Sequence, residues 1–161
     1  MATSAITGEN FYSGTWEQIS NILRVLNIGE GKLARITQVL INEYQETVDR
    51  EIDGILSQLY QTPIKEFNQM QADGVTRRVF PGDIRRHARY MVAGRILLSE
   101  FTQLAQNITE QAQGYVDDAT RALYAIIRFN HRIPGQVRKS TGFSVTMPPS
   151  LQPAAVPELN V

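Results

Sequence analysis

The chain contains no cysteine among its 161 residues, and this absence excludes several classes of function. Without a thiol there is no disulfide scaffold, no cysteine nucleophile and no thiolate metal site. The two histidines, His87 and His131, lie far apart in sequence and have no partner at metal-ligand spacing. We therefore expect neither a metal site nor a cofactor.

Long apolar runs and an excess of one charge are also missing. No stretch of about 18 apolar residues occurs, so no membrane-spanning helix is expected. The first residues lack a basic region followed by an apolar block, so we expect no signal peptide. Sixteen Lys+Arg balance 16 Asp+Glu, whereas free-standing nucleic-acid binders usually carry a basic excess. The composition and length predict one soluble, non-secreted domain.

The zero balance conceals a gradient along the chain. Residues 1–80 hold 7 Lys+Arg and 10 Asp+Glu, a net charge of −3, and residues 81–161 hold 9 and 6, a net charge of +3. Copies of such a chain could associate, acidic part to basic part. An uneven scatter of solvated side chains explains the difference equally well, and both interpretations stay open.

Apolar periodicity predicts about four helices after a loose arm formed by the first dozen residues. The first helix covers about 15–27, with Thr15 and Gln18 forming a capping box. The second covers about 31–60 and ends because of Pro63. Its apolar stripe repeats at spacings of three and four residues and comprises Ile36, Leu40, Tyr44, Val48, Ile52, Ile55 and Leu59.

Two more helices follow in the second half. The third begins with Asp83 as its N-cap, behind Pro81, and its apolar pattern continues to Ala105. A break at residues 107–109 separates it from the fourth, which Thr109 caps and which ends at about His131. Small residues in both, Gly94 among them, permit a close approach of the two helices.

The stretch at about 64–81 has a different pattern. Two alternating runs flank Ala72-Asp73-Gly74, and Asp-Gly is a strong turn signal for a β-hairpin. We expect a mainly α fold: a small bundle of about four helices with one β-hairpin insertion, within a domain at residues 1–135. An isolated hairpin is marginally stable in water, so this one should pack on the helices or on another chain.

Residues 136–161 are predicted to form an extended C-terminal arm. Five of the seven prolines fall in the last 28 residues, and such a segment cannot bury a core of its own. It is either disordered or an arm that orders along a partner, and the alternation at 143–147 favours the arm. Its apolar anchors would be Phe143, Val145, Met147 and Leu151.

Few residues are candidates for chemistry. Asp49 and Asp53 share a helix face, but no histidine pair matches them, so we interpret them as solvated or interface carboxylates. The glycines at 29 and 31 lack the remaining glycine and hydroxyl of a phosphate-binding loop and indicate a turn. No nucleophile–base arrangement can be assembled, and we do not expect an enzyme.

The most concentrated charge is an arginine-rich segment at the start of the second half. It could be a solvated face, a protein interface or a phosphate-binding surface, although it lacks the interleaved aromatics of a single-strand binder. Its members are Arg77, Arg78, Arg85, Arg86, Arg89 and Arg95.

One series of residues is similar to a known signature. Residues 48–63 read VDREIDGILSQLYQTP. They resemble the long helix of tailed-phage head-to-tail connectors, the adaptor proteins also found in Mu-like prophages, which ends Ile-Asp-x-x-Leu-x-x-x-Tyr before a proline. A proline-started helix follows, here Pro81 to Leu98, and then a last helix with Tyr115, Ala119 and Leu123 that ends near Gly135. The likeness spans about residues 15–135, while the hairpin and the tail are longer than in the plainest members.

The resemblance implies a structural protein of the virion, assembled in the host cytoplasm and located in the neck between capsid and tail. Such adaptors form a ring, usually of twelve subunits, that docks on the portal protein and joins it to the next neck protein, a stopper or tail terminator. Double-stranded DNA passes through the ring without specific binding. C-terminal arms in the family grip the portal, which would give the anchors at 143–151 this role.

A ring requires one face of each copy to contact a different face of the next. The subunit-interface candidates come from the acidic and the arginine-rich halves: Asp49, Asp53, Arg78, Arg85, Arg86 and Arg89. The alternative is a small DNA-associated or regulatory helical protein that uses the Arg77–Arg95 segment.

Overall fold

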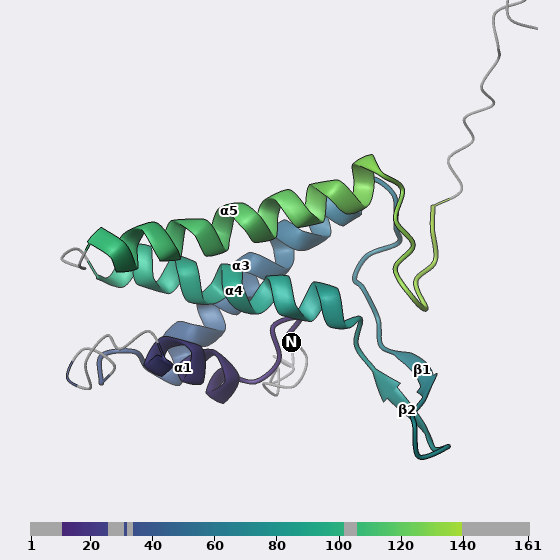
Figure 1. The fold of residues 1–161 in the computed structure, drawn as a ribbon, viewed down its shortest axis with the longest axis horizontal. Helices are drawn as coiled ribbons and strands as arrows, with labels where there is room; N and C mark the ends of the chain where they lie inside the picture. The colour runs from purple at the N-terminus through teal and green to yellow at the C-terminus, as the bar shows by residue number, and fades with distance from the viewer. Residues whose placement is uncertain (1–10, 26–30, 32–33, 102–105, 140–161) are drawn as a thin grey trace, which may run out of the picture.

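The computed structural model of the chain describes residues 11–25, 31, 34–101 and 106–139. These residues are mainly helical, as predicted. The helices are α1 (Trp16–Val25), α3 (Gln38–Leu56), α4 (Gly82–Glu100) and α5 (Gln106–Arg128), and the strands are β1 (Phe67–Met70) and β2 (Thr76–Val79). Figure 1 shows α4 and α5 lying antiparallel side by side, with α3 crossing behind them and α1 below.

A single apolar core joins the helices. Each contributes fully or nearly fully buried side chains from one face, and Trp16 at the start of α1 packs against this core. The largest buried apolar side chains include Ile19, Leu23, Ile41, Ile52, Leu56, Tyr60, Ile84, Met91, Ile96, Leu97 and Leu123.

Helix α3 is shorter than the predicted helix at 31–60. Thr37 has extended backbone angles (φ −83°, ψ 159°), and its hydroxyl accepts a hydrogen bond from the N–H of Leu40, so the helix begins at Gln38. It ends at Leu56, well before Pro63, so the proline does not terminate it. In the first half of the predicted stripe, Ile36 and Tyr44 are half-buried and pack against the core, whereas the buried positions are Ile41 and Gln45.

The starts of α4 and α5 differ from the predictions. Pro81 occupies the N-cap position of α4 without a side-chain cap, and Asp83 lies inside the first turn. The negative carboxylate of Asp83 there interacts favourably with the positive end of the helix dipole. Helix α5 is already helical at Gln106, so the predicted break at 107–109 is wrong and Thr109 does not occupy the cap position.

Close contact between α4 and α5 is confirmed at Gly94. This glycine is buried, and a Cβ there would lie 2.7 Å from the carbonyl oxygen of Ala112 and 2.8 Å from Val116 Cγ2. Only a hydrogen atom fits in this space, so Gly94 sets the separation of the two helices.

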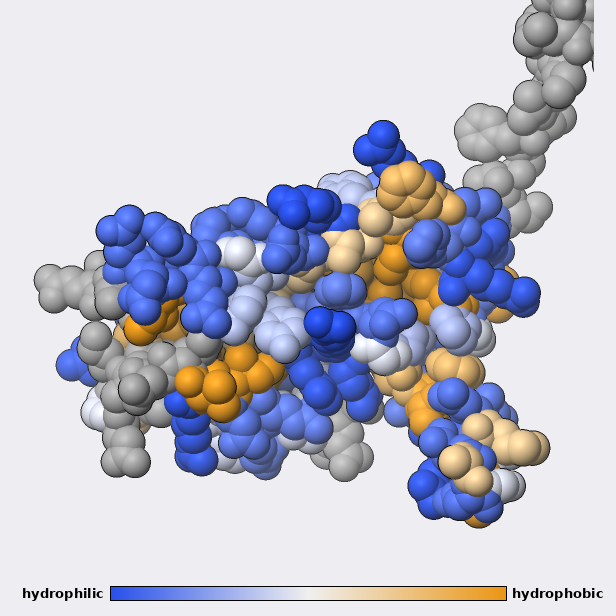
Figure 2. Space-filling view, viewed as in Figure 1, coloured by the Kyte–Doolittle hydropathy of each residue, from blue (hydrophilic) through white to orange (hydrophobic). Residues whose placement is uncertain are grey.

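The hairpin is confirmed with its predicted turn. Strands β1 and β2 pair antiparallel, Phe67 opposite Val79 and Met70 opposite Thr76, around the residues 71–75. Gly74 has a positive φ of 76°, which the turn requires. The strand residues are exposed except for Phe67 and Val79 at the base. Figures 1 and 2 show the hairpin projecting away from the helices.

Residues 136–139, predicted to belong to the arm, bond to the helical body. Lys139 N–H donates to the Leu59 carbonyl, Gln61 N–H donates to the Val137 carbonyl, and Tyr60 and Arg138 form an antiparallel bridge. The four anchors proposed for the arm (Phe143, Val145, Met147 and Leu151) lie outside the described residues, as do most of the residues of the glycine turn at 29–32.

Candidate functional site

The two candidate carboxylates of α3 hold an N-terminal segment of their own chain. Tyr12 N–H donates to Asp49 Oδ2 at 3.1 Å, and the Tyr12 hydroxyl donates to Asp53 Oδ1 at 2.5 Å. The same hydroxyl accepts a hydrogen bond from the N–H of Ile64 at 2.7 Å. One tyrosine thus connects the N-terminal segment, α3 and the approach to the hairpin.

Burial changes the acidity of this cluster. It raises the pKa of Asp49 to about 7, an effect that the hydrogen bond from Tyr12 N–H only partly opposes. Burial also raises the pKa of Asp53, and burial together with the hydrogen bond to Asp53 raises the pKa of Tyr12. The two carboxylates therefore differ from the freely solvated pair that is one interpretation of their spacing.

The neighbouring residues of the segment are held from α3 as well, and from one further helix, α4. Gln45, fully buried in α3, donates through Nε2 to Ser13 Oγ at 2.6 Å and to the Gly14 carbonyl at 2.8 Å. Arg89 of α4 donates through Nε to the Ser13 carbonyl at 2.9 Å and through Nη2 to Gln18 Oε1 at 2.5 Å. Asp49, Asp53 and Arg89 are thus brought together around residues 11–14.

This anchoring is what sequence reasoning missed, because the first dozen residues lack periodicity and were expected to form a loose arm. Phe11 and Tyr12 are each 4% exposed, and the Tyr12 ring stacks on Phe80 with centroids 5.1 Å apart. The available signal was an adjacent aromatic pair directly before the predicted start of a helix.

The other arginines of the Arg77–Arg95 segment separate into two groups. Arg95 forms an ion pair with Glu51, and Arg85 lies 5.3 Å above the Phe80 ring, so both are engaged within the body. Arg77 and Arg78 are on the hairpin and form only exposed ion pairs, and Arg86 is exposed on α4. The segment is not one continuous cationic face.

A second cationic group assembles beside the hairpin from distant parts of the sequence. The Gln136 side chain forms hydrogen bonds with the backbone of Lys65, and the backbone of Arg138 forms a β-bridge with that of Tyr60. Arg132 lines a hollow of about 260 Å³ together with Phe67 and Pro81. The hairpin end of the molecule therefore carries Lys65, Arg77, Arg78, Arg132, Arg138 and Lys139. Local sequence patterns could not predict that residues 65–78 lie close to residues 132–139.

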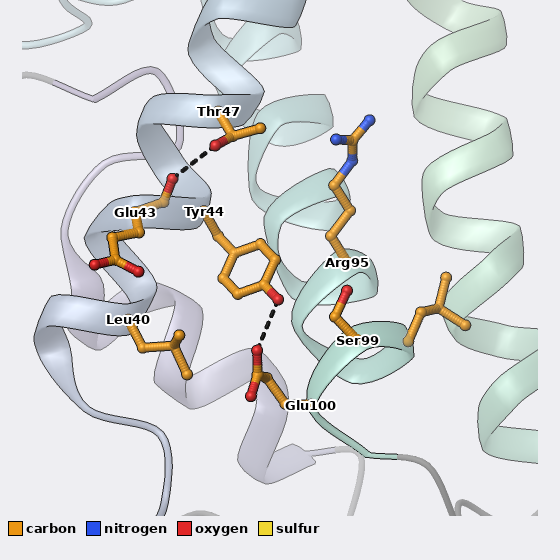
Figure 3. Close-up of a pocket in the computed structure, with 8 residues that line it drawn as sticks. Leu40, Glu43, Tyr44, Thr47, Arg95, Ser99 and Glu100 are labelled. Carbon is orange, nitrogen blue, oxygen red and sulfur yellow. Dashed lines mark hydrogen bonds between the residues drawn. The ribbon is translucent and has the colours of Figure 1, made fainter.

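A groove of about 470 Å³ lies between α3 and the C-terminal half of α4 (Figure 3). Its apolar lining consists of Leu40, Leu98 and the Tyr44 ring, which points from α3 toward α4. The Tyr44 hydroxyl donates to Glu100 Oε1 at 2.8 Å, and Glu43 also lines the groove. Both glutamates are exposed, and Arg95, which is paired with Glu51, also lines the groove, so the groove combines an apolar lining with two carboxylates and one paired cation.

No group of three or more side chains suited to metal binding occurs within the residues that the structure describes. None of the helices in that part of the chain is long and apolar enough to cross a membrane.

Comparisons of the chain with protein-family models, with curated proteins and with solved structures find no match.

Proposed function

We propose that this chain is a head-to-tail adaptor of a tailed phage, a ring subunit that docks on the portal, connects the capsid to the neck and surrounds the passing DNA. The ring would contain about twelve copies and contact a stopper or tail terminator on its other side. The observation that carries the proposal is the signature at 48–63, followed in order by two helices, α4 and α5, as the resemblance implies.

The residues of that signature have specific positions that support the proposal. Ile52, Leu56 and Tyr60 are fully buried, and Asp53 bonds Tyr12. The Tyr60 hydroxyl donates to the His131 carbonyl and accepts from Ile133 N–H at 3.0 Å. The signature thus joins the end of α3 to the segment after α5, from which the C-terminal residues continue.

Two exposed features suit a protein that works by docking. The hairpin stands away from the helices, and large apolar side chains on the surface include Met70 at 72% and Phe129 at 63% exposure. Apolar side chains exposed on a projecting element are typical of contacts with other chains. In a ring adaptor they would contact the neighbouring copies, the portal or the neck.

The alternative, a DNA-associated or regulatory protein, is favoured only by the cations at the hairpin end. The Arg77–Arg95 segment supports this alternative less than the sequence implied, because Arg85, Arg89 and Arg95 form contacts within the chain. Phosphate contacts by several exposed cations would make binding to duplex DNA fall steeply with added salt.

Mixing the full-length chain with the portal protein of the same genome tests the proposal. We expect a stable complex that elutes together from a sizing column and shows a ring under the portal by electron microscopy. The opposite result would be a chain that does not bind portal but binds duplex DNA tightly, with an affinity that falls steeply as salt is added. That result would contradict the adaptor proposal and favour the alternative.

A further inference from the structure

The hairpin lacks the packing that a two-stranded ribbon needs. Its strand residues are exposed except at the base, and Met70 and Val75 at the tip are 72% and 52% exposed. Two strands alone are marginally stable in water and need a third strand or a packing surface. The hairpin therefore has the properties of an element that completes its packing on another surface.

The α3–α4 groove has complementary chemistry. Leu40, Leu98 and the Tyr44 ring offer an apolar lining, and the exposed carboxylates of Glu43 and Glu100 lie beside it. Arg95 also lines the groove, but its charge is paired with Glu51. The hairpin presents apolar Met70 and Val75 together with exposed Arg77 and Arg78. The two arginines pair with Asp73 and Glu66 only through exposed contacts, which contribute little and can exchange.

A chain cannot place its own hairpin in its own groove. The hairpin leads directly into the N-terminus of α4, whereas Leu98, Ser99 and Glu100 of the groove are at its C-terminus. Nineteen helical residues separate these ends by about 28 Å at 1.5 Å per residue. Figure 1 shows the hairpin and the C-terminal end of α4 at opposite ends of the molecule.

We propose that the β1–β2 hairpin of one copy docks in the α3–α4 groove of the next copy. Met70 and Val75 at the tip contact the apolar lining. Arg77 and Arg78 point to opposite faces of the ribbon, so one faces Glu43 on α3 and the other faces Glu100 on α4. The contact joins two different surfaces, so it is heterologous and produces a closed ring or an open filament. This inference rests on the proposed ring and specifies which surfaces build it.

The absence of cysteine in the chain permits a clean test by disulfide trapping. Val75→Cys places one thiol at the hairpin tip, and Ser99→Cys places one in the groove. Asp117→Cys, exposed on α5 away from the groove, is the matched control. The full-length variants are mixed in pairs under mild oxidation, with and without the portal protein, and disulfide-linked dimers are quantified.

Docking raises the effective concentration of the two thiols, so V75C with S99C should give at least about tenfold more linked heterodimer than V75C with D117C. Each variant alone should give no more than that control. No excess of heterodimer, or efficient linking of V75C to itself, would overturn the inference. If wild-type chain in the same buffer still forms a ring that binds portal, the proposed function survives that result.

Charge exchange supplies a second measurement. E43R/E100R and R77E/R78E should each reduce assembly, whereas equal amounts of the two variants should assemble in alternation, because each mixed contact restores opposite charges. Circular dichroism establishes that both variants are folded. Assembly lost in each variant and not restored in the mixture would contradict the pairing of these four side chains.

Discussion

The Tyr12 hydroxyl donates a 2.5 Å hydrogen bond to Asp53, joining residues 41 positions apart in the sequence. The same oxygen accepts the N–H of Ile64, and the Tyr12 ring stacks on Phe80. Tyr12 thus fastens the N-terminal segment to α3 and to both ends of the hairpin insertion. The position of the projecting hairpin depends on this contact.

Stability should fall as the pH rises through the titration of Asp49. Its pKa is about 7 in the folded chain, above the ordinary value of 3.8, so the folded state binds this proton more tightly than the unfolded state. The contribution is fully present below about pH 4 and is lost as pH approaches and passes 7. Urea unfolding at pH 5 and pH 8 measures it.

Asp49→Asn is the matched variant for this prediction. The decrease in unfolding free energy between pH 5 and pH 8 should be smaller in D49N than in the wild type by about 1–3 kcal/mol, since one pKa unit corresponds to about 1.4 kcal/mol. Asp53 stays in both proteins and contributes a decrease of the same sign. Equal pH dependence in the two proteins would show that Asp49 ionises normally.

Tyr60→Phe should destabilise the fold by about 1–3 kcal/mol. Tyr60 is fully buried, and its hydroxyl accepts the buried N–H of Ile133 and donates to the His131 carbonyl, so removing the oxygen leaves both groups unpaired. Tyr124→Phe is the control, because Tyr124 is 51% exposed. Thermal unfolding compares the two, and equal melting temperatures would exclude a structural role for the hydroxyl.

Gly94→Ala should destabilise the α4–α5 contact, whereas Gly54→Ala should be neutral or stabilising by up to about 1 kcal/mol. A Cβ at position 94 would meet the Ala112 carbonyl, but at position 54 it would meet nothing within 4 Å. Both substitutions raise helix propensity equally, so denaturant unfolding isolates the steric cost. If the G94A and G54A chains have the same free energy of unfolding, the two helices can move apart to accommodate the Cβ without loss of stability.

Two truncations should separate the C-terminal residues that stabilise the body from those available for docking. Removing residues 136–161 should lower the melting temperature below that of a chain that lacks only residues 140–161, because Lys139, Val137 and Gln136 bond to residues 59–65. Both truncations should abolish portal binding if the anchors at 143–151 grip the portal. Portal binding retained by the shorter truncation would contradict that role.

Local patterns predicted most elements of the fold. The apolar periods located the four helices, and Asp73-Gly74 located the turn of the hairpin. Bounds were wrong where capping chemistry decided them: Thr37 starts α3, and Pro81 rather than Asp83 occupies the N-cap of α4. A stripe of apolar residues shows which face is buried but not where hydrogen bonding begins.

The contacts between distant segments could not be predicted in this way. The spacing of Asp49 and Asp53 placed them on one helix face, but nothing local indicated that Tyr12 would lie against them. Likewise, Lys65 contacts Gln136 and Tyr60 contacts Arg138 because the chain after α5 returns along residues 59–65. Such pairings depend on the packing of the whole bundle.

The mass of the full-length chain in solution, measured by light scattering on a sizing column with and without portal, tests the proposed ring most directly. The adaptor proposal predicts one discrete species of about twelve copies, in a closed ring, either alone or on the portal. A chain that remains a monomer under both conditions would contradict it.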